Sequence, residues 1–214
     1  MIRAVLFDCD GTLVDSEPIW LATLNDHIAD HIAAWPGSPA VPLRFADIEG
    51  QSMARSLQLV EARLGHPLPP GFETVVRADM ARRFETALCE MPGATELLRG
   101  LRLPCCVASN GPRSKIALVL RLTGLDRFFP PDRVFSAVEL GRYKPDPALF
   151  LQAAEALGVA PAECAVVEDS RAGIEAGLRA GMRVYAYLPH APLRPEDAVR
   201  GVQHLPHLSH LRDI

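Results

Sequence analysis

The apolar positions of the chain fall into short continuous runs and longer stretches with helical spacing. A continuous run is typical of a strand that is buried on both faces of a parallel sheet. The five runs are Ala4–Phe7, Cys105–Ala108, Val134–Val138, Ala165–Val167 and Val184–Tyr187. Helical patterns separate the last four runs, for example after Pro112 and after Asp146-Pro147. Strands that alternate with helices predict a doubly wound, Rossmann-like α/β sheet.

About a hundred residues separate the first predicted strand from the second, and most of them have helical spacing. Apolar stripes run through Leu21–Trp35, Met53–Leu64 and Phe72–Phe84, with a loop predicted at residues 35–39. We therefore predict an α/β core made of residues 1–16 and 89–214, with an all-helical domain inserted at residues 17–88. The tail after the last predicted strand is rich in proline and histidine and gives no clear pattern.

Composition narrows the class of protein. The 214 residues are 49% hydrophobic and carry a net charge of −4, so we expect a folded protein with no general attraction to nucleic acid or to anionic membranes. The chain shows no signal-peptide pattern and no apolar stretch long enough to cross a bilayer, so we expect a cytoplasmic protein. The five cysteines form no Cys-x-x-Cys pair, which argues against a zinc site. The oligomeric state stays open.

Polar side chains follow four of the predicted strands. Asp8 and Asp10 come after the first strand, Ser109-Asn110 after the second, Lys144 after the third and Glu168-Asp169 after the fourth. Ligands of open parallel sheets bind beyond the carboxyl ends of the strands, so we expect all four groups to face one crevice. Each group alone could be a turn, a helix cap or a surface charge, but together they form a complementary set.

This set suits phosphoryl transfer. Carboxylate oxygens of Asp8 and Asp169 are the hard donors that Mg²⁺ prefers, and a bound cation would make clustered carboxylates tolerable. Lys144 and the hydroxyl of Ser109 could contact phosphoryl oxygens, and backbone N–H groups of the first loop could add donors. A small phosphorylated molecule is therefore the expected substrate.

The same residues resemble the motifs of the haloacid dehalogenase superfamily. The match consists of Asp8-Cys9-Asp10-Gly11-Thr12-Leu13-Val14-Asp15, Ser109-Asn110, Lys144-Pro145-Asp146-Pro147 and Glu168-Asp169-Ser170 with Ala172-Gly173-Ile174. All four motifs occur in order over nearly the whole chain. The branch that carries a helical cap after the first motif contains phosphatases and β-phosphoglucomutases, and the predicted insertion lies where that cap belongs.

The resemblance implies a role for each motif residue. Asp8 would be the nucleophile that forms an aspartyl-phosphate, and Asp10 would protonate the leaving oxygen and then activate water. The metal ion would be held by Asp8, by the backbone carbonyl of Asp10 and by Asp169, with Glu168 supporting these ligands from outside. Ser109, Asn110 and Lys144 would bind the phosphate.

Three other activities compete with hydrolysis of a sugar phosphate. Dehalogenases of this superfamily replace the second acid, so Asp10 argues against that activity. The mutases carry a histidine and an arginine where this chain has Trp20 and Met53, which favours the phosphatases. The core motifs resemble bacterial sugar-phosphate phosphatases most, including the 6-phosphogluconate phosphatases. A catalytically idle Mg²⁺-binding or interaction protein is the third alternative. Gln51, Arg55 and Arg113 are candidates for substrate contacts beyond the phosphate.

Three smaller features give separate expectations. Gly173, Gly177 and Gly181 recur every fourth residue, and because glycine costs a helix about 1 kcal/mol we expect a close approach of that helix to the sheet. Cys9 is interpreted as a small spacer between the two acids rather than a catalytic thiol. His27 and His31 are interpreted as part of a solvated helix face rather than a metal site.

Overall fold

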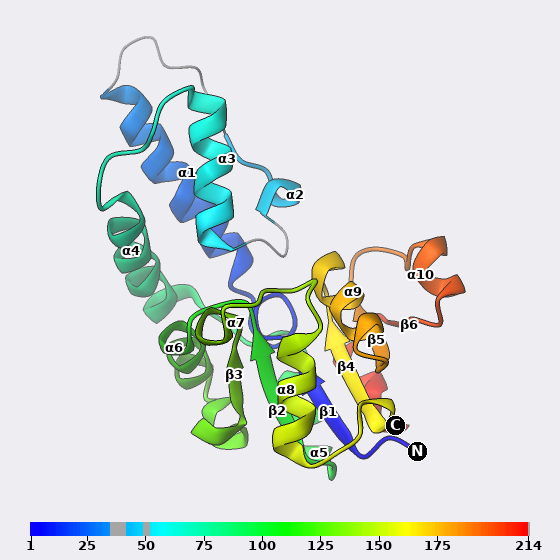
Figure 1. Cartoon of the computed structure of the whole chain (residues 1–214). Helices are drawn as coiled ribbons and strands as arrows, with labels where there is room; N and C mark the ends of the chain where they lie inside the picture. Colours follow the sequence, from blue (N-terminus) through cyan, green and yellow to red (C-terminus); the bar gives the residue numbers. More distant parts are fainter. Residues whose placement is uncertain (35–41, 49–51, 214) are drawn as a thin grey trace. The chain divides into compact units, whose positions relative to one another are not determined.

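The computed structural model describes residues 1–34, 42–48 and 52–213 of the chain. The chain divides into two compact units, which we call the core unit and the helical unit (Figure 1). The core unit contains Met1–Asp15 and Cys89–Ile214, and the helical unit contains Ser16–Leu88. Each unit has its own buried apolar side chains.

The core unit is built on one sheet of six parallel strands. They are β1 (Ala4–Phe7), β2 (Cys105–Ser109), β3 (Val134–Ser136), β4 (Cys164–Glu168), β5 (Arg183–Tyr187) and β6 (Gln203–Leu205). Their order is β3-β2-β1-β4-β5-β6, and β1 pairs with both β2 and β4. The chain runs outward from β1 to β3 and then returns to β4, so the order reverses beside β1. Such a reversal is where open α/β sheets bind their ligands.

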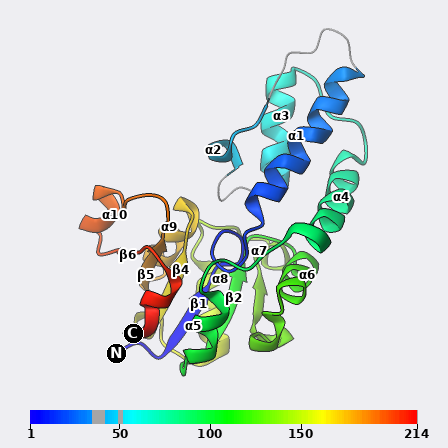
Figure 2. The same ribbon diagram turned by 180° about the vertical axis from the view of Figure 1, so that it is seen from behind.

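Helices cover both faces of this sheet. The α-helices of the core unit are α5 (Ala94–Gly100), α6 (Arg113–Thr123), α7 (Ala137–Leu140), α8 (Ala148–Leu157), α9 (Arg171–Arg179) and α10 (Pro195–Val199). The 3₁₀ turns are η1 (Asp126–Phe128), η2 (Pro131–Arg133), η3 (Pro161–Glu163) and η4 (Leu208–Asp213). Helices α8 and α9 lie against one face, and α5, α6 and η4 lie on the other (Figures 1 and 2).

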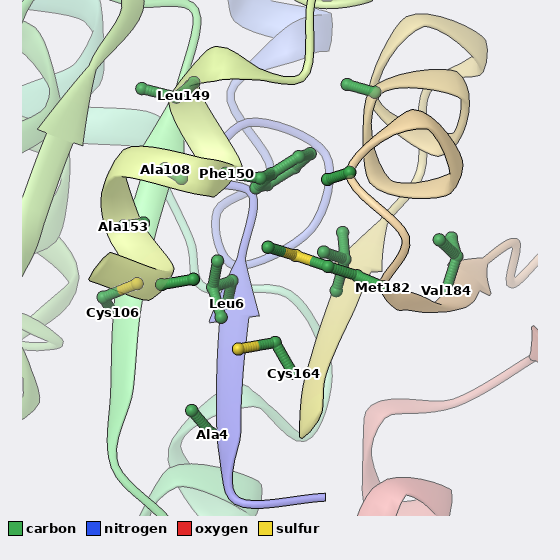
Figure 3. Close-up of a cluster of buried hydrophobic side chains, with 14 of the residues drawn as sticks. Ala4, Leu6, Cys106, Ala108, Leu149, Phe150, Ala153, Cys164, Met182 and Val184 are labelled. Carbon is green, nitrogen blue, oxygen red and sulfur yellow. The ribbon is translucent and has the colours of Figure 1, made fainter. Parts of the chain in front are cut away.

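The packing of the sheet follows from the alternation of side chains along each strand. Ala4 and Leu6 of β1 belong to the apolar cluster beneath α8, together with Phe150 and Ala153 of that helix (Figure 3). Because neighbouring side chains of a strand point to opposite faces, Phe7 lies on the other face, where its ring meets Phe129 edge-on at a centroid distance of 6.4 Å. Every residue of β1 is buried, which explains why this strand has no polar position.

The helical unit contains α1 (Glu17–Ala33), α2 (Phe45–Ile48), α3 (Met53–Leu64) and α4 (Phe72–Ala87). Apolar residues at helical spacing bury one stripe of each long helix, including Leu24 and Ile28 of α1. The interpretation of His27 as solvated is wrong. Its Nε2 lies 3.1 Å from Oδ2 of Asp79 on α4, and its side chain is 21% exposed, because α1 packs against α4 on this side.

The predicted α/β fold is confirmed, and the strands differ from the prediction by more than one residue at two places. The third strand ends at Ser136, because Ala137 and Val138 already belong to α7, whose turn is closed by the N–H of Gly141 donating to Ala137. Strand β6 was not predicted. The loop expected at residues 35–39 lies outside the described residues. Within the described part of the chain, no helix is both long and apolar enough to cross a membrane.

Candidate active site

The loop after β1 positions the first two acids. Asp8 still belongs to the sheet ladder, because its N–H donates to Val167 of β4 at 3.0 Å. The chain then turns tightly: the carbonyl of Cys9 accepts from Leu13 and Val14, and Gly11 has the positive φ of 81° that this turn requires. The side chains of Asp8 and Asp10 therefore start from fixed backbone at the carboxyl end of the central strand.

Lys144 joins the first strand to the fourth. Its ammonium group forms ion pairs with Asp8 and with Oε1 of Glu168, the latter at 2.6 Å, and its side chain is only 2% exposed. The ammonium also lies 4.8 Å from the centre of the Phe150 ring. Asn110 fixes the backbone of the lysine, since its Oδ1 accepts from the N–H of Lys144 at 3.0 Å. Residues from three other segments thus surround the ammonium group, and a fourth segment fixes the backbone of the lysine.

Burial and charge compete at this cluster. Burial raises the pKa of Asp8 to about 7, because Lys144 lowers it only in part and Glu168 adds to the rise. Burial alone would lower the pKa of Lys144, but Asp8 and Glu168 outweigh it and raise that pKa above its ordinary value. The lysine therefore stays protonated. A second cation beside Asp8 would favour its carboxylate form further.

Glu168 is held from two sides. Its Oε1 accepts from Lys144, and its Oε2 accepts from both the N–H and the hydroxyl of Ser170 at 2.9 Å. Helix α9 starts directly above it, and a Cβ on Gly173 would lie 1.7 Å from Oε1 of Glu168. Gly173 is therefore needed for this approach, and Gly177 for the contact of α9 with Val184. Gly181 instead has a positive φ of 72° in the turn after the helix.

Three carboxylates form a candidate metal site. Oxygen atoms of Asp8, Glu168 and Asp169 all lie within 4.8 Å of one another. The hydroxyl of Thr12 donates to Oδ1 of Asp169 at 2.8 Å, which links this residue to the first loop. An all-oxygen donor set suits Mg²⁺, and a bound divalent cation would counteract the burial that raises the pKa of Asp8. Since both oxygens of Glu168 already accept hydrogen bonds, the arrangement fits Asp8 and Asp169 as the direct ligands.

Asp10 has a lysine of its own. Its Oδ1 pairs with the ammonium of Lys115, the third residue of α6, and the two side chains are 23% and 20% exposed. Between the two acids, burial raises the pKa of the Cys9 thiol to about 12. A thiol with so high a pKa is a poor nucleophile at neutral pH, which agrees with Cys9 as a spacer.

The last residue of β2 carries the predicted phosphate-binding hydroxyl at the same edge of the sheet. Ser109 is 2% exposed, and its Oγ accepts from the N–H of Gly111 at 3.0 Å. Ser136, at the end of β3, donates to the carbonyl of Gly111 at 2.7 Å. The structure therefore brings Asp8, Lys144, Glu168 and Asp169 into one cluster, and places Ser109 at the end of the neighbouring strand β2 with Asn110 directly after it.

The candidates for further substrate contacts have different surroundings. Arg113 donates to Glu139 and to the carbonyl of Pro131, which ties α6 to its neighbours in the core unit. Arg55 is the third residue of α3 in the helical unit, where its N–H donates to the side chain of Ser52 and its guanidinium donates to Gln58. Gln51 lies outside the described residues.

Sequence reasoning missed Lys115, Phe150 and the role of Ser170. Ser170 could have been found, because serine directly before a helix is a strong capping signal, and its hydroxyl does accept from Gly173. Lys115 lies 105 residues from Asp10, and nothing in the spacing of the chain joins them.

Comparisons with known proteins agree with this architecture. The family model for haloacid dehalogenase-like hydrolases matches residues 2–181. The chain is 36% identical over 214 residues to 6-phosphogluconate phosphatase of Escherichia coli, a match that covers 98% of this chain and 94% of the relative. It is 30% identical to a phosphorylated carbohydrates phosphatase of Thermotoga maritima, covering 86% and 84% of the two chains.

A solved structure extends the comparison to three dimensions. A putative β-phosphoglucomutase from Thermotoga maritima superposes with a TM-score of 0.77 at 25% identity, covering 99% of this chain and 97% of the other. The resemblance expected from the four motifs is therefore confirmed by sequence and by structure. With its parallel sheet, its inserted helices and its acids at the strand ends, the chain belongs to the haloacid dehalogenase-like hydrolases.

Proposed function

We propose that the protein is a Mg²⁺-dependent phosphatase that hydrolyses a small phosphorylated sugar or sugar acid through an aspartyl-phosphate. The observation that carries the proposal is the convergence of Asp8, Lys144, Glu168 and Asp169 beside the loop that bears Asp10. The wider reaction class, hydrolysis of a phosphoric monoester, rests on family membership and on relatives that are named as phosphatases.

In the proposed reaction, a carboxylate oxygen of Asp8 attacks phosphorus and the bond from phosphorus to the substrate oxygen breaks. Asp10 gives its proton to that leaving oxygen. In the second step Asp10 takes a proton from water, the water oxygen attacks the phosphorus of the aspartyl-phosphate, and inorganic phosphate leaves while Asp8 is regenerated. Lys144 and Ser109 hold the phosphoryl oxygens in both steps.

The candidate metal site adds the last component of the proposed mechanism. Asp8, Asp169 and the backbone carbonyl of Asp10 would hold Mg²⁺, and Glu168 would keep Lys144 and the ligands in place. When bound, the ion offsets negative charge on the nucleophile and on the transferring phosphoryl group. The helical unit is the candidate cap of the family, in which Gln51 and Arg55 are candidate contacts to the sugar, with Arg113 from the core unit.

The substrate class comes from the relatives. The two named above act on 6-phosphogluconate and on phosphorylated carbohydrates, and both matches cover more than four fifths of each chain. The test is a Mg²⁺-supported screen that measures phosphate release from 6-phosphogluconate, hexose phosphates, hexitol phosphates, phosphoglycolate and nucleotides. We expect the highest kcat/KM among the sugar and sugar-acid phosphates, and no release without a divalent cation.

The same assay separates the alternatives. A mutase would convert a sugar phosphate into its isomer with little free phosphate, as the structural neighbour named a β-phosphoglucomutase suggests for the shared fold. The histidine and arginine of the mutase cap are replaced at Trp20 and Met53, so we expect phosphate rather than isomer. An idle metal-binding protein would release none from any compound, including 4-nitrophenyl phosphate.

A further inference from the structure

The ion pair between Lys115 and Asp10 is not explained by the motifs of the family. Lys115 belongs to the first turn of α6, and its side chain reaches back to the loop after β1. Its stem passes Gly111, where an added Cβ would lie 3.6 Å from Cδ of the lysine and 3.5 Å from Oγ of Ser109. The stem of Lys115 and the predicted phosphate-binding hydroxyl therefore both lie next to Gly111.

The pair differs from an ordinary surface ion pair. Exposed pairs contribute little, because two long side chains must be ordered in a strongly screening solvent. Here about four fifths of each side chain is covered, with 20% of Lys115 and 23% of Asp10 exposed. The backbone of Asp10 is fixed by the turn around Gly11, but its carboxyl group can still rotate. A lysine anchored on α6 is a means of limiting that rotation.

Asp8 and Asp10 thus form ion pairs with different lysines, although Lys115 also lies close enough to Asp8 to lower its pKa. Lys144 pairs with Asp8 and Glu168, whereas Lys115 pairs with Asp10. Lys144 lies beside the proposed nucleophile and phosphate. Lys115 lies beside the residue that would exchange a proton with the leaving oxygen. Removing one lysine should therefore affect a different part of the reaction from removing the other.

We propose that Lys115 is the positioning residue of Asp10, holding its carboxyl group in the orientation from which it protonates the leaving oxygen. This inference rests on the proposed function. Lys115 donates to Oδ1 of Asp10, and a carboxyl group can accept at one oxygen while the other carries a proton. In the proposed arrangement the proton passes from Oδ2 of Asp10 to the leaving oxygen as the bond from that oxygen to phosphorus breaks, and Lys115 keeps its own protons.

The test uses leaving groups that differ in their need for a proton. Phenyl phosphate releases a basic oxygen that must be protonated, whereas 2,4-dinitrophenyl phosphate of similar shape releases a stable anion. We expect Lys115→Met to lower kcat/KM for phenyl phosphate roughly 10- to 100-fold, as misplacement of a general acid does. For 2,4-dinitrophenyl phosphate the loss should be less than about 3-fold. Lys115→Arg should recover part of the loss on phenyl phosphate.

Two further variants complete the design. Arg121→Met removes an exposed positive charge from the last turn of the same helix and should behave as the wild type on both substrates. Asp10→Asn should show the same selective loss as Lys115→Met, but larger. Thermal unfolding of each variant tests whether it is folded. If Lys115→Met is not folded, Lys115→Gln takes its place.

The outcomes separate the two hypotheses. Suppose that Asp10→Asn lowers kcat/KM selectively for phenyl phosphate, but that Lys115→Met lowers kcat/KM equally for both substrates or changes KM alone. The positioning role is then wrong, and Lys115 binds phosphate or only stabilises the fold. If Asp10→Asn itself shows no selectivity, the proposed acid role of Asp10 fails, and the role of Lys115 fails with it.

Discussion

At the scale of single residues, the site depends on how much charge is buried around Asp8. Asp8→Asn removes the proposed nucleophile, so we expect phosphate release to fall by roughly 10⁴-fold or more. The fold should survive, because Lys144 keeps its ion pair with Glu168 at 2.6 Å and is not left as an isolated buried charge. Steady-state phosphate release and the thermal unfolding midpoint check both parts, and turnover at the wild-type rate would contradict the role of Asp8.

Gly173 offers a test of the position of Glu168. A Cβ at this glycine would lie 1.7 Å from Oε1 of Glu168, so Gly173→Ala must displace the carboxylate or helix α9. We expect a loss of about 1–3 kcal/mol in the free energy of unfolding, as for other overpacked sites, and roughly 10- to 100-fold in kcat/KM. Gly100→Ala is the control, since nothing lies within 4 Å of its Cβ position. Equal behaviour of the two variants would show that the contact is unimportant.

The residues differ in how far the sequence predicts them. Asp8, Ser109, Lys144 and Asp169 follow separate strands, and parallel strands bring their carboxyl ends to one edge, so strand order alone predicts that they meet. The pairing of Lys144 with Glu168 as well as Asp8 depends on the side-chain conformation of a lysine after β3. Lys115 contacts Asp10 through a long flexible side chain, which no apolar periodicity records.

At the scale of secondary-structure elements, the sequence predicts the buried apolar strands well, but it does not predict the more polar strand and turn near the end of the chain. All residues of β1 and β4 are buried, and all of them are apolar except Glu168 at the end of β4, so both strands can be recognised as apolar runs. Strand β6, at one edge of the sheet, has only Leu205 buried among its three residues, so it forms no apolar run. The turn η4 follows Pro206, and its contact with α5, more than a hundred residues earlier, is a tertiary effect that local sequence does not reveal.

The packing of η4 on α5 predicts a structural role for the tail. Leu208 is fully buried in η4, so Leu208→Ala should lower the free energy of unfolding by about 2–4 kcal/mol through lost contacts and the cavity left behind. The site residues lie elsewhere in the core unit, so kcat/KM of the folded enzyme should not change. Urea unfolding and steady-state kinetics measure the two effects. Val199→Ala, at an 88% exposed position, is the control, and a similar small effect of both variants would refute the prediction.

The link between α2 and α3 predicts a dependence of stability on pH. Hydrogen bonds from Arg63 and from the backbone of Arg44 hold the pKa of Asp47 at about 2, below its ordinary value of 3.8. The ionised form is therefore favoured by folding, and its contribution is present above about pH 4 and lost as the pH falls toward 2.

Asp47→Asn should remove the part of the pH dependence of stability that comes from Asp47, and should leave the part that comes from the other acids. Both tryptophans, Trp20 and Trp35, fall within residues 16–88, so the fluorescence of unfolding reports on the helical unit. Urea unfolding of wild type and variant at several values between pH 2 and pH 6 makes the comparison. An unchanged slope in the variant would show that another acid is responsible. Asp30→Asn, at an exposed position on α1, is the control.

At the scale of the whole molecule, the residues of the proposed chemistry and of the candidate metal site all belong to the core unit. Binding of Mg²⁺ should therefore stabilise that unit by mass action, by about 2.7 kcal/mol at a concentration one hundred times Kd. Hydrogen exchange of the β1 and β4 amides, which lie in the buried centre of the sheet, should slow by roughly 100-fold under these conditions. Asp169→Asn should abolish the effect, whereas Asp132→Asn, which removes a 77% exposed carboxylate of the same unit, should retain it. Equal protection with and without Mg²⁺ in the wild type would mean that these carboxylates do not hold the ion, and the hydrolytic mechanism would then need another source of positive charge beside Asp8.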